Sequence, residues 1–259
     1  MNFKPIILNG FEEGREQKLE KIKRYIEDIT PVMFYRTNDL LHSQRVRWHL
    51  EEALNKILNI YPNFNVNFAR TLAKVHDDLE ILTDDITLYA KERMTSKERE
   101  ELVEKEKQFV PDLTKTYSEI ANNESYEKLL LASKNKDSLE SQFVSFFDKF
   151  DGAGEAWHEV WAGNEFFILP AGGKDAINGG YIRRLNKFPI EYPNMQEFFK
   201  KFPEYLPQPI NLIKIAMNGK PHTAKSLEKN TNYVPYERWK RNIIKNEGID
   251  FLTTQIEFY

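Results

Sequence analysis

The most informative stretch of this chain reads Lys74-Val75-His76-Asp77-Asp78-Leu79-Glu80-Ile81-Leu82. Apolar residues at helical spacing precede it from about residue 66, which predicts that His76 and Asp77 lie at the end of a helix. An adjacent imidazole and carboxylate offer nitrogen and oxygen ligands to one divalent cation. Glu80 shares their face if the helix continues. A carboxylate that stands near a metal without binding it suits a general base for an activated water molecule.

Three other segments carry residues of the same chemical types. Upstream, the segment Arg36-Thr37-Asn38-Asp39-Leu40-Leu41-His42-Ser43 places a histidine at the start of a predicted helix. Immediately after the central stretch comes Thr83-Asp84-Asp85-Ile86, and Phe147-Asp148-Lys149-Phe150-Asp151 lies inside a later predicted helix. A His-Asp pair alone is a weak signal because two letters recur by chance. The order of the segments is what makes the pattern specific.

In this order the chain resembles the HD superfamily of metal-dependent phosphohydrolases, whose ligands run His, then His-Asp, then Asp. It is most similar to the branch that contains bacterial 5′-deoxynucleotidases. That branch has a His-Asp-x-x-Glu-x-x-x-Gly-Asp segment and a late Ala-Asp-x-Leu segment followed by Ala-Gly-Asn, which here reads Ala162-Gly163-Asn164. The resemblance covers roughly residues 28–168. It implies one divalent metal ion held by the side chains of His42, His76, Asp77 and Asp148.

The resemblance also implies roles for residues around the metal. Glu80 matches the acidic residue that activates water, and Asp85 matches the second acid, proposed to protonate the leaving oxygen. Arg36 falls near a family arginine and could hold phosphate through its planar fork. Lys149 could also lie near the phosphate. Two imidazoles and two carboxylates with no thiolate suit Mn²⁺, Co²⁺, Fe²⁺, Zn²⁺ and Ni²⁺ alike, so the sequence does not choose the metal.

Three positions depart from the family pattern. Leu41 stands before the first histidine, where the family usually has Glu. Asp84-Asp85 replaces Gly-Asp, so that either carboxylate could face the site. Ile29-Thr30 precedes Pro31, where the closest enzymes have an Arg-Trp pair that grips the nucleotide. The first two departures concern the acids, and the third concerns the choice of substrate.

These residues lead to one expected function and to alternatives. We expect an enzyme that hydrolyses the 5′-phosphate of (deoxy)nucleoside monophosphates with metal-activated water. The same ligands would suit a nucleoside triphosphate triphosphohydrolase, or a hydrolase of cyclic nucleotides or nucleotide alarmones. A metal-stabilised interaction module without catalysis is the alternative from another class. Relatives in the family often form dimers, so by analogy we expect a homodimer.

The predicted secondary structure is helical throughout the first two thirds of the chain. Apolar periodicity and helix-end signals predict helices over residues 11–29, 42–60, 66–77, 115–133 and 138–163, with a break near Asn122-Asn123 left open. Thr95-Ser96-Lys97-Glu98 predicts an N-terminal cap ahead of a highly charged helix that stops before Pro111. After Gly163 proline and glycine become frequent, and only short helices near 195–202 and 236–246 are expected. We therefore predict an all-α fold, with an HD-type helical bundle over residues 1–170. A partly irregular C-terminal extension of unknown role, residues 171–259, would pack on it.

The composition is that of a globular protein. Of 259 residues, 41% are hydrophobic, and 18 Phe and 12 Tyr can fill a core. The absence of cysteine excludes disulfides, zinc-thiolate sites and cysteine nucleophiles, and fits a reducing compartment. A net charge of −3 is far from a nucleic-acid-binding balance. No signal-peptide pattern and no apolar run of about 18 residues is visible, so we expect a cytoplasmic protein without membrane contact.

Overall fold

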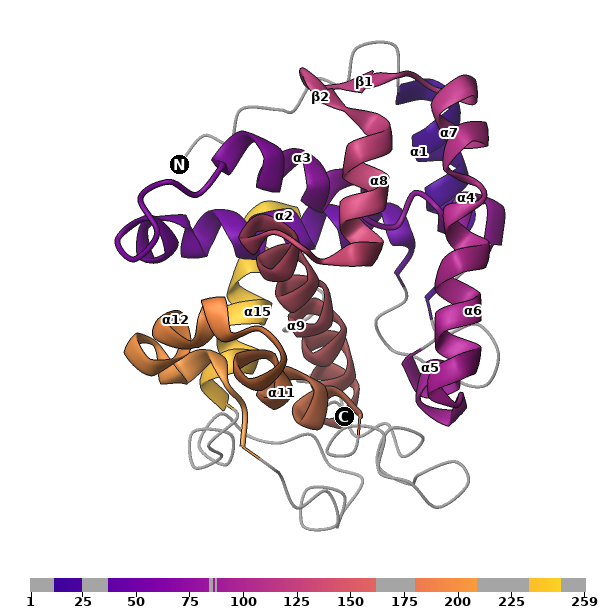
Figure 1. Cartoon of the computed structure of the whole chain (residues 1–259). Helices are drawn as coiled ribbons and strands as arrows, with labels where there is room; N and C mark the ends of the chain where they lie inside the picture. Colours follow the sequence, from indigo (N-terminus) through magenta and orange to yellow (C-terminus); the bar gives the residue numbers. More distant parts are fainter. Residues whose placement is uncertain are drawn as a thin grey trace. The chain divides into compact units, whose positions relative to one another are not determined.

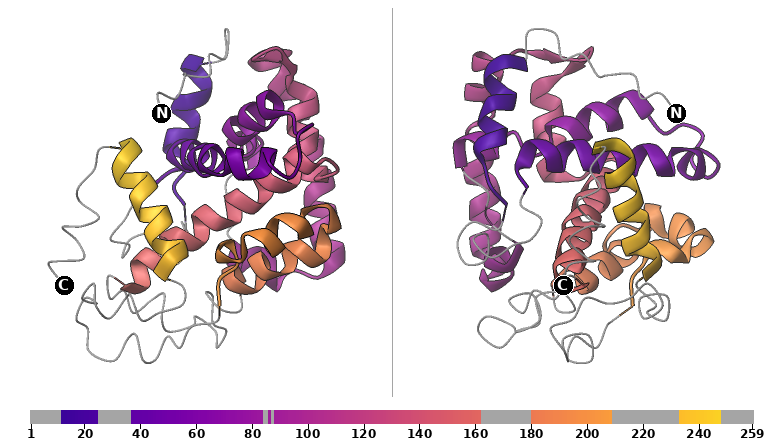
Figure 2. Two further views of the ribbon diagram at one scale, coloured as in Figure 1. Left: turned by 90° about the vertical axis from the view of Figure 1, so that its left-hand side faces the viewer. Right: turned by 180° about the vertical axis from the view of Figure 1, so that it is seen from behind.

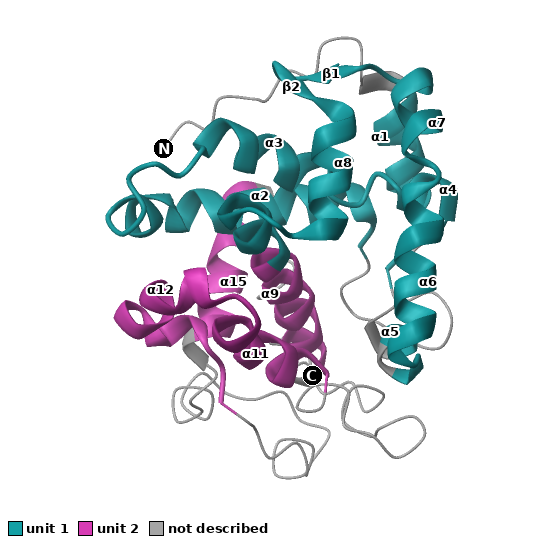
Figure 3. Ribbon diagram, viewed as in Figure 1, with its two compact units in different colours: residues 1–24, 37–145 teal, residues 25–36, 146–259 magenta. Residues whose placement is uncertain are grey.

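The computed structural model describes residues 12–24, 37–83, 86, 88–161, 180–208 and 233–247 (Figure 1). These parts are mostly helical, which confirms the predicted all-α class. The chain divides into two compact units, residues 1–24 with 37–145 and residues 25–36 with 146–259 (Figure 3). The boundary predicted near residue 170 falls among residues 162–179, outside the described residues, and stays a prediction.

The first unit is a set of packed helices joined by short connections. Its helices are α1 (Glu12–Lys21), α2 (Asp39–Leu58), α3 (Val66–Val75), α4 (Glu80–Thr83), α5 (Leu88–Arg93), α6 (Ser96–Lys107), α7 (Val110–Thr116) and α8 (Tyr126–Asn135). Figure 2 shows from two further sides that α2 and α3 lie side by side. Helix α1 packs on α2 and α4, and α8 packs on α3. This arrangement brings the start of α2 and the end of α3 together.

Side-chain caps fix where the helices of the first unit begin. Asn38 caps α2 by accepting from the backbone N–H of Leu41, and Asn65 caps α3 by accepting from Phe68. At the start of α6 the predicted cap is confirmed as a capping box, in which Thr95 and Glu98 each accept from the other's backbone N–H. Such caps satisfy backbone donors that a helix start leaves without an intrahelical partner. The caps thereby fix the residues at which α2 and α3 begin.

A helix was predicted over residues 115–133 with a break near Asn122-Asn123 left open, and the structure has this break. Helix α7 ends at Thr116, and an antiparallel hairpin of β1 (Ile120–Ala121) and β2 (Glu124–Ser125) separates it from α8. The two turn residues have positive φ angles of 48° at Asn122 and 66° at Asn123. Asparagine adopts this left-handed conformation more readily than most residues, and two such residues in a row match a hairpin turn. The Asn-Asn pair therefore forms a turn that separates α7 from α8.

The first predicted helix is also shorter than expected. It was predicted to reach residue 29, whereas α1 ends at Lys21 and Lys23 forms an isolated bridge with Asn38. The backbone N–H of Asp39 donates to the carbonyl oxygen of Ile22 at 3.1 Å. The chain after α1 is thus tied to the start of α2, because these backbone groups pair between segments instead of along a helix.

The second unit holds most of α9 and the helices that follow it. Helix α9 (Leu139–Trp161) begins in the first unit and continues into the second, where it is followed by α11 (Arg183–Glu191), η4 (Pro193–Met195), α12 (Gln196–Lys201), η5 (Pro203–Tyr205) and α15 (Tyr233–Glu247). Helices α12 and α15 confirm the two short helices expected from the sequence. Aromatic rings form the core: Phe146 contacts the rings of Phe188 and Phe199 at centroid distances of 5.3 and 4.9 Å.

A glycine on α9 lets α15 approach closely within the second unit. A Cβ atom at Gly154 would lie 2.2 Å from the indole ring of Trp239, so this position excludes any larger residue without rearrangement. The indole Nε1 of Trp239 donates to Asp151 at 2.8 Å, which gives this buried carboxylate a fixed partner. None of the helices in the described ranges combines the length and the apolar character that crossing a membrane requires.

Candidate metal site

Two histidines and one aspartate of the first unit point their ligand atoms at the same place. His42 lies in the first turn of α2, and His76 directly follows α3. The Nε2 atoms of His42 and His76 lie 3.4 and 3.2 Å from the same carboxylate oxygen, Oδ2 of Asp77. The two imidazole rings are 5.3 Å apart between centroids. Both histidines are buried, as Asp77 largely is, with residue exposures of 0, 6 and 9%.

These separations fit a shared cation. Nitrogen and oxygen ligands bind Zn²⁺ and similar ions at about 2.0–2.2 Å, so two ligand atoms on one ion lie about 3–3.5 Å apart. The observed distances of 3.4 and 3.2 Å fall in this range. Imidazole with carboxylate is a donor set that first-row divalent metals favour. Among the described residues, His42 and His76 also belong, together with Asp148, to a His/Asp group that could hold a metal ion.

The backbone around His76 prepares its ring for this role. Nδ1 of His76 lies 2.9 Å from the carbonyl oxygen of Ala73, in the last turn of α3. A carbonyl only accepts, so Nδ1 must carry the proton and donate, which leaves Nε2 as the atom with a lone pair. A metal-ligating histidine is usually fixed in this way through its other ring nitrogen. The end of α3 thereby selects the tautomer that can bind a cation.

A second group of carboxylates adjoins the first through Asp77. One oxygen each from Asp39, Asp77 and Glu80 lie within 4.8 Å of one another, and Asp39 and Glu80 are only 0 and 5% exposed. Glu80 was expected here on the assumption that α3 continues. Instead α3 ends at Val75, a turn follows, and Glu80 begins the short helix α4. The turn still brings Glu80 beside the ligand Asp77, as its predicted role requires.

Asp39 is a site residue that the sequence reasoning missed. It precedes His42 by three residues in α2, and residues three apart in a helix share a face. That spacing was the available signal. The Arg24 guanidinium lies 3.7 Å from Oδ1 of Asp39, so this buried carboxylate also has a cation of the chain near it.

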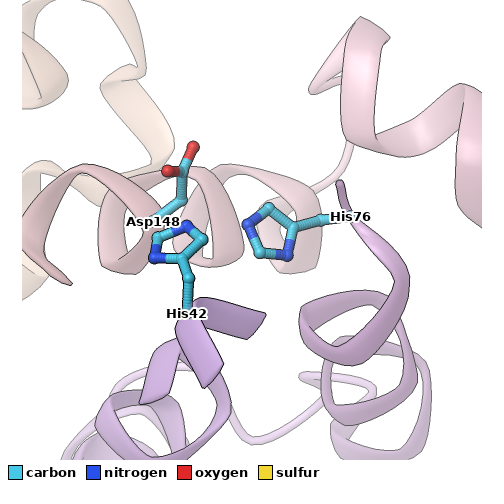
Figure 4. Close-up of side chains that lie close together, drawn as sticks. All are labelled: His42, His76 and Asp148. Carbon is cyan, nitrogen blue, oxygen red and sulfur yellow. The ribbon is translucent and has the colours of Figure 1, made fainter. Parts of the chain in front are cut away.

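The fourth predicted ligand, Asp148, projects from α9 just after the residue at which the first unit ends. One nitrogen of each histidine and one carboxylate oxygen of Asp148 lie within 4.8 Å of one another (Figure 4). The neighbouring Lys149 donates from Nζ to Oδ2 of Asp148 at 2.7 Å. Lys149 was predicted to bind phosphate, and in the structure its ammonium group neutralises this carboxylate.

The remaining predicted residues are Arg36, Asp84 and Asp85, which lie outside the described residues. Their roles stay predictions. Of the other described histidines, His49 is buried in α2 and His158 is buried in α9. Nδ1 of His158 lies 3.1 Å from the hydroxyl of Tyr236. Among the described histidines, His42 and His76 are the two that belong to a group able to hold a metal ion.

Comparisons with protein-family models, with curated proteins and with solved structures found no match for this chain. The resemblance to the HD superfamily accordingly rests on the motifs alone, and the function is argued from the site.

Proposed function

We propose that this chain is a metal-dependent phosphohydrolase of the HD type that removes the 5′-phosphate from (deoxy)nucleoside monophosphates. One observation carries the proposal: the Nε2 atoms of two buried histidines lie 3.4 and 3.2 Å from one oxygen of Asp77. Together with the predicted ligand Asp148, this would give the ion two nitrogen and two oxygen donors. A cation held there supplies Lewis acidity, which lowers the pKa of water and withdraws charge from a phosphate oxygen.

The residues of the chain would supply the proton transfers. Glu80 lies beside the ligand Asp77, so its carboxylate can accept a proton from the water molecule that attacks phosphorus. As the new bond between oxygen and phosphorus forms, the bond from phosphorus to the 5′-oxygen breaks. Asp85, or its neighbour Asp84, would return a proton to that leaving oxygen. Arg36 would bind the non-bridging phosphate oxygens and stabilise the charge that develops on them.

Burial of the site favours this chemistry. His42 is fully buried and Glu80 is 5% exposed, so charges there interact through a medium that screens them less than water does. A nucleotide phosphate entering this site would exchange its water for fixed donors and a cation. This environment suits a reaction whose transition state is stabilised by preorganised charges.

The test is phosphate release from a panel of ribo- and deoxynucleotides with added Mn²⁺ or Co²⁺. We expect metal-dependent release from monophosphates by the native protein, and loss of release in both Asp77→Ala and Glu80→Gln. Calorimetry separates the two roles: Asp77→Ala should no longer bind Mn²⁺, whereas Glu80→Gln should bind it and turn over about 10²–10⁴-fold more slowly. Glu100→Gln, on the exposed surface of α6, is the matched control and should behave as the native protein.

Other outcomes would move the proposal or end it. If the protein released triphosphate or pyrophosphate, or opened a cyclic nucleotide, the proposed metal chemistry would stand and the proposed substrate would be wrong. Metal binding without turnover of any substrate, with Glu80→Gln functionally silent, would favour the non-catalytic interaction module. A native protein that binds no divalent metal would contradict the proposed function.

A further inference from the structure

An arginine of the N-terminal helix reaches the turn that carries two of the metal ligands. Arg15 in α1 is 0% exposed. Its Nε and Nη2 atoms donate to the two carboxylate oxygens of Asp78, each at 2.6 Å. The same Nη2 also donates to the backbone carbonyl of Lys74 at 2.7 Å. Asp78 directly follows the ligand pair His76-Asp77, and Lys74 lies two residues before it. Arg15 therefore binds the chain on both sides of this pair.

A third donor completes the attachment of Asp78. The hydroxyl of Tyr126, the first residue of α8, donates to Oδ2 of Asp78 at 2.7 Å. Burial raises the pKa of Tyr126, so its hydroxyl stays protonated and keeps donating. Burial alone would lower the pKa of Arg15, but the charge of Asp78 raises it above the ordinary value. The guanidinium therefore remains charged and keeps donating through its fork.

The ligand turn also serves as the end of α3. A helix end leaves its last four carbonyls without intrahelical donors, here those of Leu72, Ala73, Lys74 and Val75. Three of them are satisfied from the turn or from Arg15. The carbonyl of Ala73 accepts from the His76 ring, that of Lys74 from Arg15, and that of Val75 from the backbone N–H of Asp78 at 3.1 Å. The hydrogen bond that sets the tautomer of His76 thus belongs to the same connected set as the bonds of Arg15.

The turn itself has little helical structure to hold it. His76 to Leu79 lie between the end of α3 and the start of α4, and Asp78 is the member of this turn whose side chain is bound to α1 and α8. Fixing the Cα and side chain of Asp78 constrains the peptide that joins it to Asp77. The direction in which Asp77 presents Oδ2 to the two imidazoles depends on that peptide.

We propose that Arg15 is a positioning residue of the metal site, which holds the ligand turn in the conformation that binds the cation. This inference rests on the proposed function, because it takes His76 and Asp77 as ligands. Under this proposal α1 contributes to the metal site through Arg15, although none of the described side chains of α1 belongs to either ligand group. Groups that orient metal ligands typically change metal affinity about 10–100-fold when they are replaced.

The first experiment measures Mn²⁺ affinity by calorimetry for the native protein and for Arg15→Lys. Lysine keeps the positive charge but loses the planar fork that binds two oxygens and the carbonyl together. We expect the dissociation constant to rise about 10–100-fold. The matched control is Arg70→Lys, since Arg70 binds Glu51 through the same fork at 2.6 and 2.6 Å between α2 and α3. The control should leave the dissociation constant within about threefold, whatever it does to thermal stability.

A graded variant protects the test from a failure to fold. Tyr126→Phe removes one hydrogen bond to Asp78 and leaves the Arg15 fork in place. We expect it to weaken Mn²⁺ binding by less than Arg15→Lys, in the same direction. If Arg15→Lys does not fold, an unchanged affinity in Tyr126→Phe would overturn the proposal.

The second experiment uses metal-free protein, so that it does not depend on the proposed function. In the native protein, ¹⁵N and ¹H NMR of the His76 ring should show the proton on Nδ1, with slow exchange because it is bonded to Ala73. Arg15→Lys should speed that exchange and mix the two tautomers, whereas Arg70→Lys should not. If native protein bound no Mn²⁺ but this contrast appeared, the proposed function would fail, while Arg15 would still be shown to hold the turn and the tautomer of His76. An unchanged His76 spectrum and unchanged affinity in Arg15→Lys would show that Arg15 only stabilises the fold.

Discussion

Two adjacent aspartates in one turn have opposite surroundings. Oδ2 of Asp77 faces the Nε2 atoms of His42 and His76 at 3.4 and 3.2 Å. Asp78 accepts two hydrogen bonds from Arg15 and one from Tyr126, at 2.6, 2.6 and 2.7 Å. The first carboxylate therefore faces two imidazoles that could hold a metal ion, and the second faces a guanidinium.

The difference teaches how buried charge is used in this unit. Asp78 is paired with a cation that belongs to the chain, so its charge stabilises the fold only while that pair is intact. Asp77 lies among groups that could hold a metal ion, so under the proposed function its charge is available for binding an exchangeable cation. Because the two lie side by side, a substitution at each should separate folding from metal binding.

The largest effect on stability is expected at Asp78. Asp78→Asn would leave the buried guanidinium of Arg15 without a charged partner, and breaking a buried pair costs about 3–5 kcal/mol. Denaturant unfolding of the metal-free protein measures this loss. The control is Asp112→Asn, at an exposed position of α7, and it should change the unfolding free energy by less than about 0.5 kcal/mol. A loss at Asp78 as small as the control's would contradict the comparison.

Asp77 should instead govern the stabilisation that metal confers. A ligand at about 100 times its dissociation constant stabilises a protein by about 2.7 kcal/mol. We expect Mn²⁺ at this excess to stabilise the native protein by that amount and to leave Asp77→Asn unchanged. Thermal unfolding with and without Mn²⁺ measures the difference. Equal stabilisation of both proteins would remove Asp77 from the ligand set.

Asp148 is expected to contribute a smaller share of the binding. Loss of one of four ligands in Asp148→Asn should weaken Mn²⁺ binding at least about tenfold, or about 1.4 kcal/mol. Calorimetry measures it. Lys149→Gln is a useful partner variant, since it removes the ammonium that donates to Asp148 at 2.7 Å. It should leave binding unchanged or tighter, and a Lys149→Gln variant that binds Mn²⁺ as weakly as Asp148→Asn would argue against Asp148 as a ligand.

The smallest effect is expected at the cap of α3, far along the helix from His76. Asn65→Ala removes the side-chain acceptor of the Phe68 N–H and should cost about 1 kcal/mol of unfolding free energy. Mn²⁺ affinity should stay as in the native protein, because the bonds at the other end of α3 hold the ligand turn. A substantial fall in affinity here would mean that general loosening of α3, and not the Arg15 contact, controls the site.

The sequence by itself determined the helical class and the chemical character of the site. The spacing of apolar residues predicted α2, α3 and α9, because a helix with one buried face must repeat its apolar residues every three to four positions. The adjacency of His76 and Asp77 predicted a metal-binding pair that the structure joins to His42. Asn122-Asn123 also indicated a break in the helix predicted over residues 115–133, and the structure has a hairpin turn there.

Only the tertiary structure decided the long-range partners. Arg15 and Asp78 are 63 residues apart, and nothing in the local pattern of either residue indicates the other. Asp39 lies beside Asp77 and Glu80 because α2 packs on α3. The identity of a residue does not indicate which other helix it will face. Periodicity reflects which face of a helix is buried, whereas the pairing of buried charges depends on how separate helices pack. That packing placed one aspartate of an adjacent pair beside His42 and His76 and the other on Arg15.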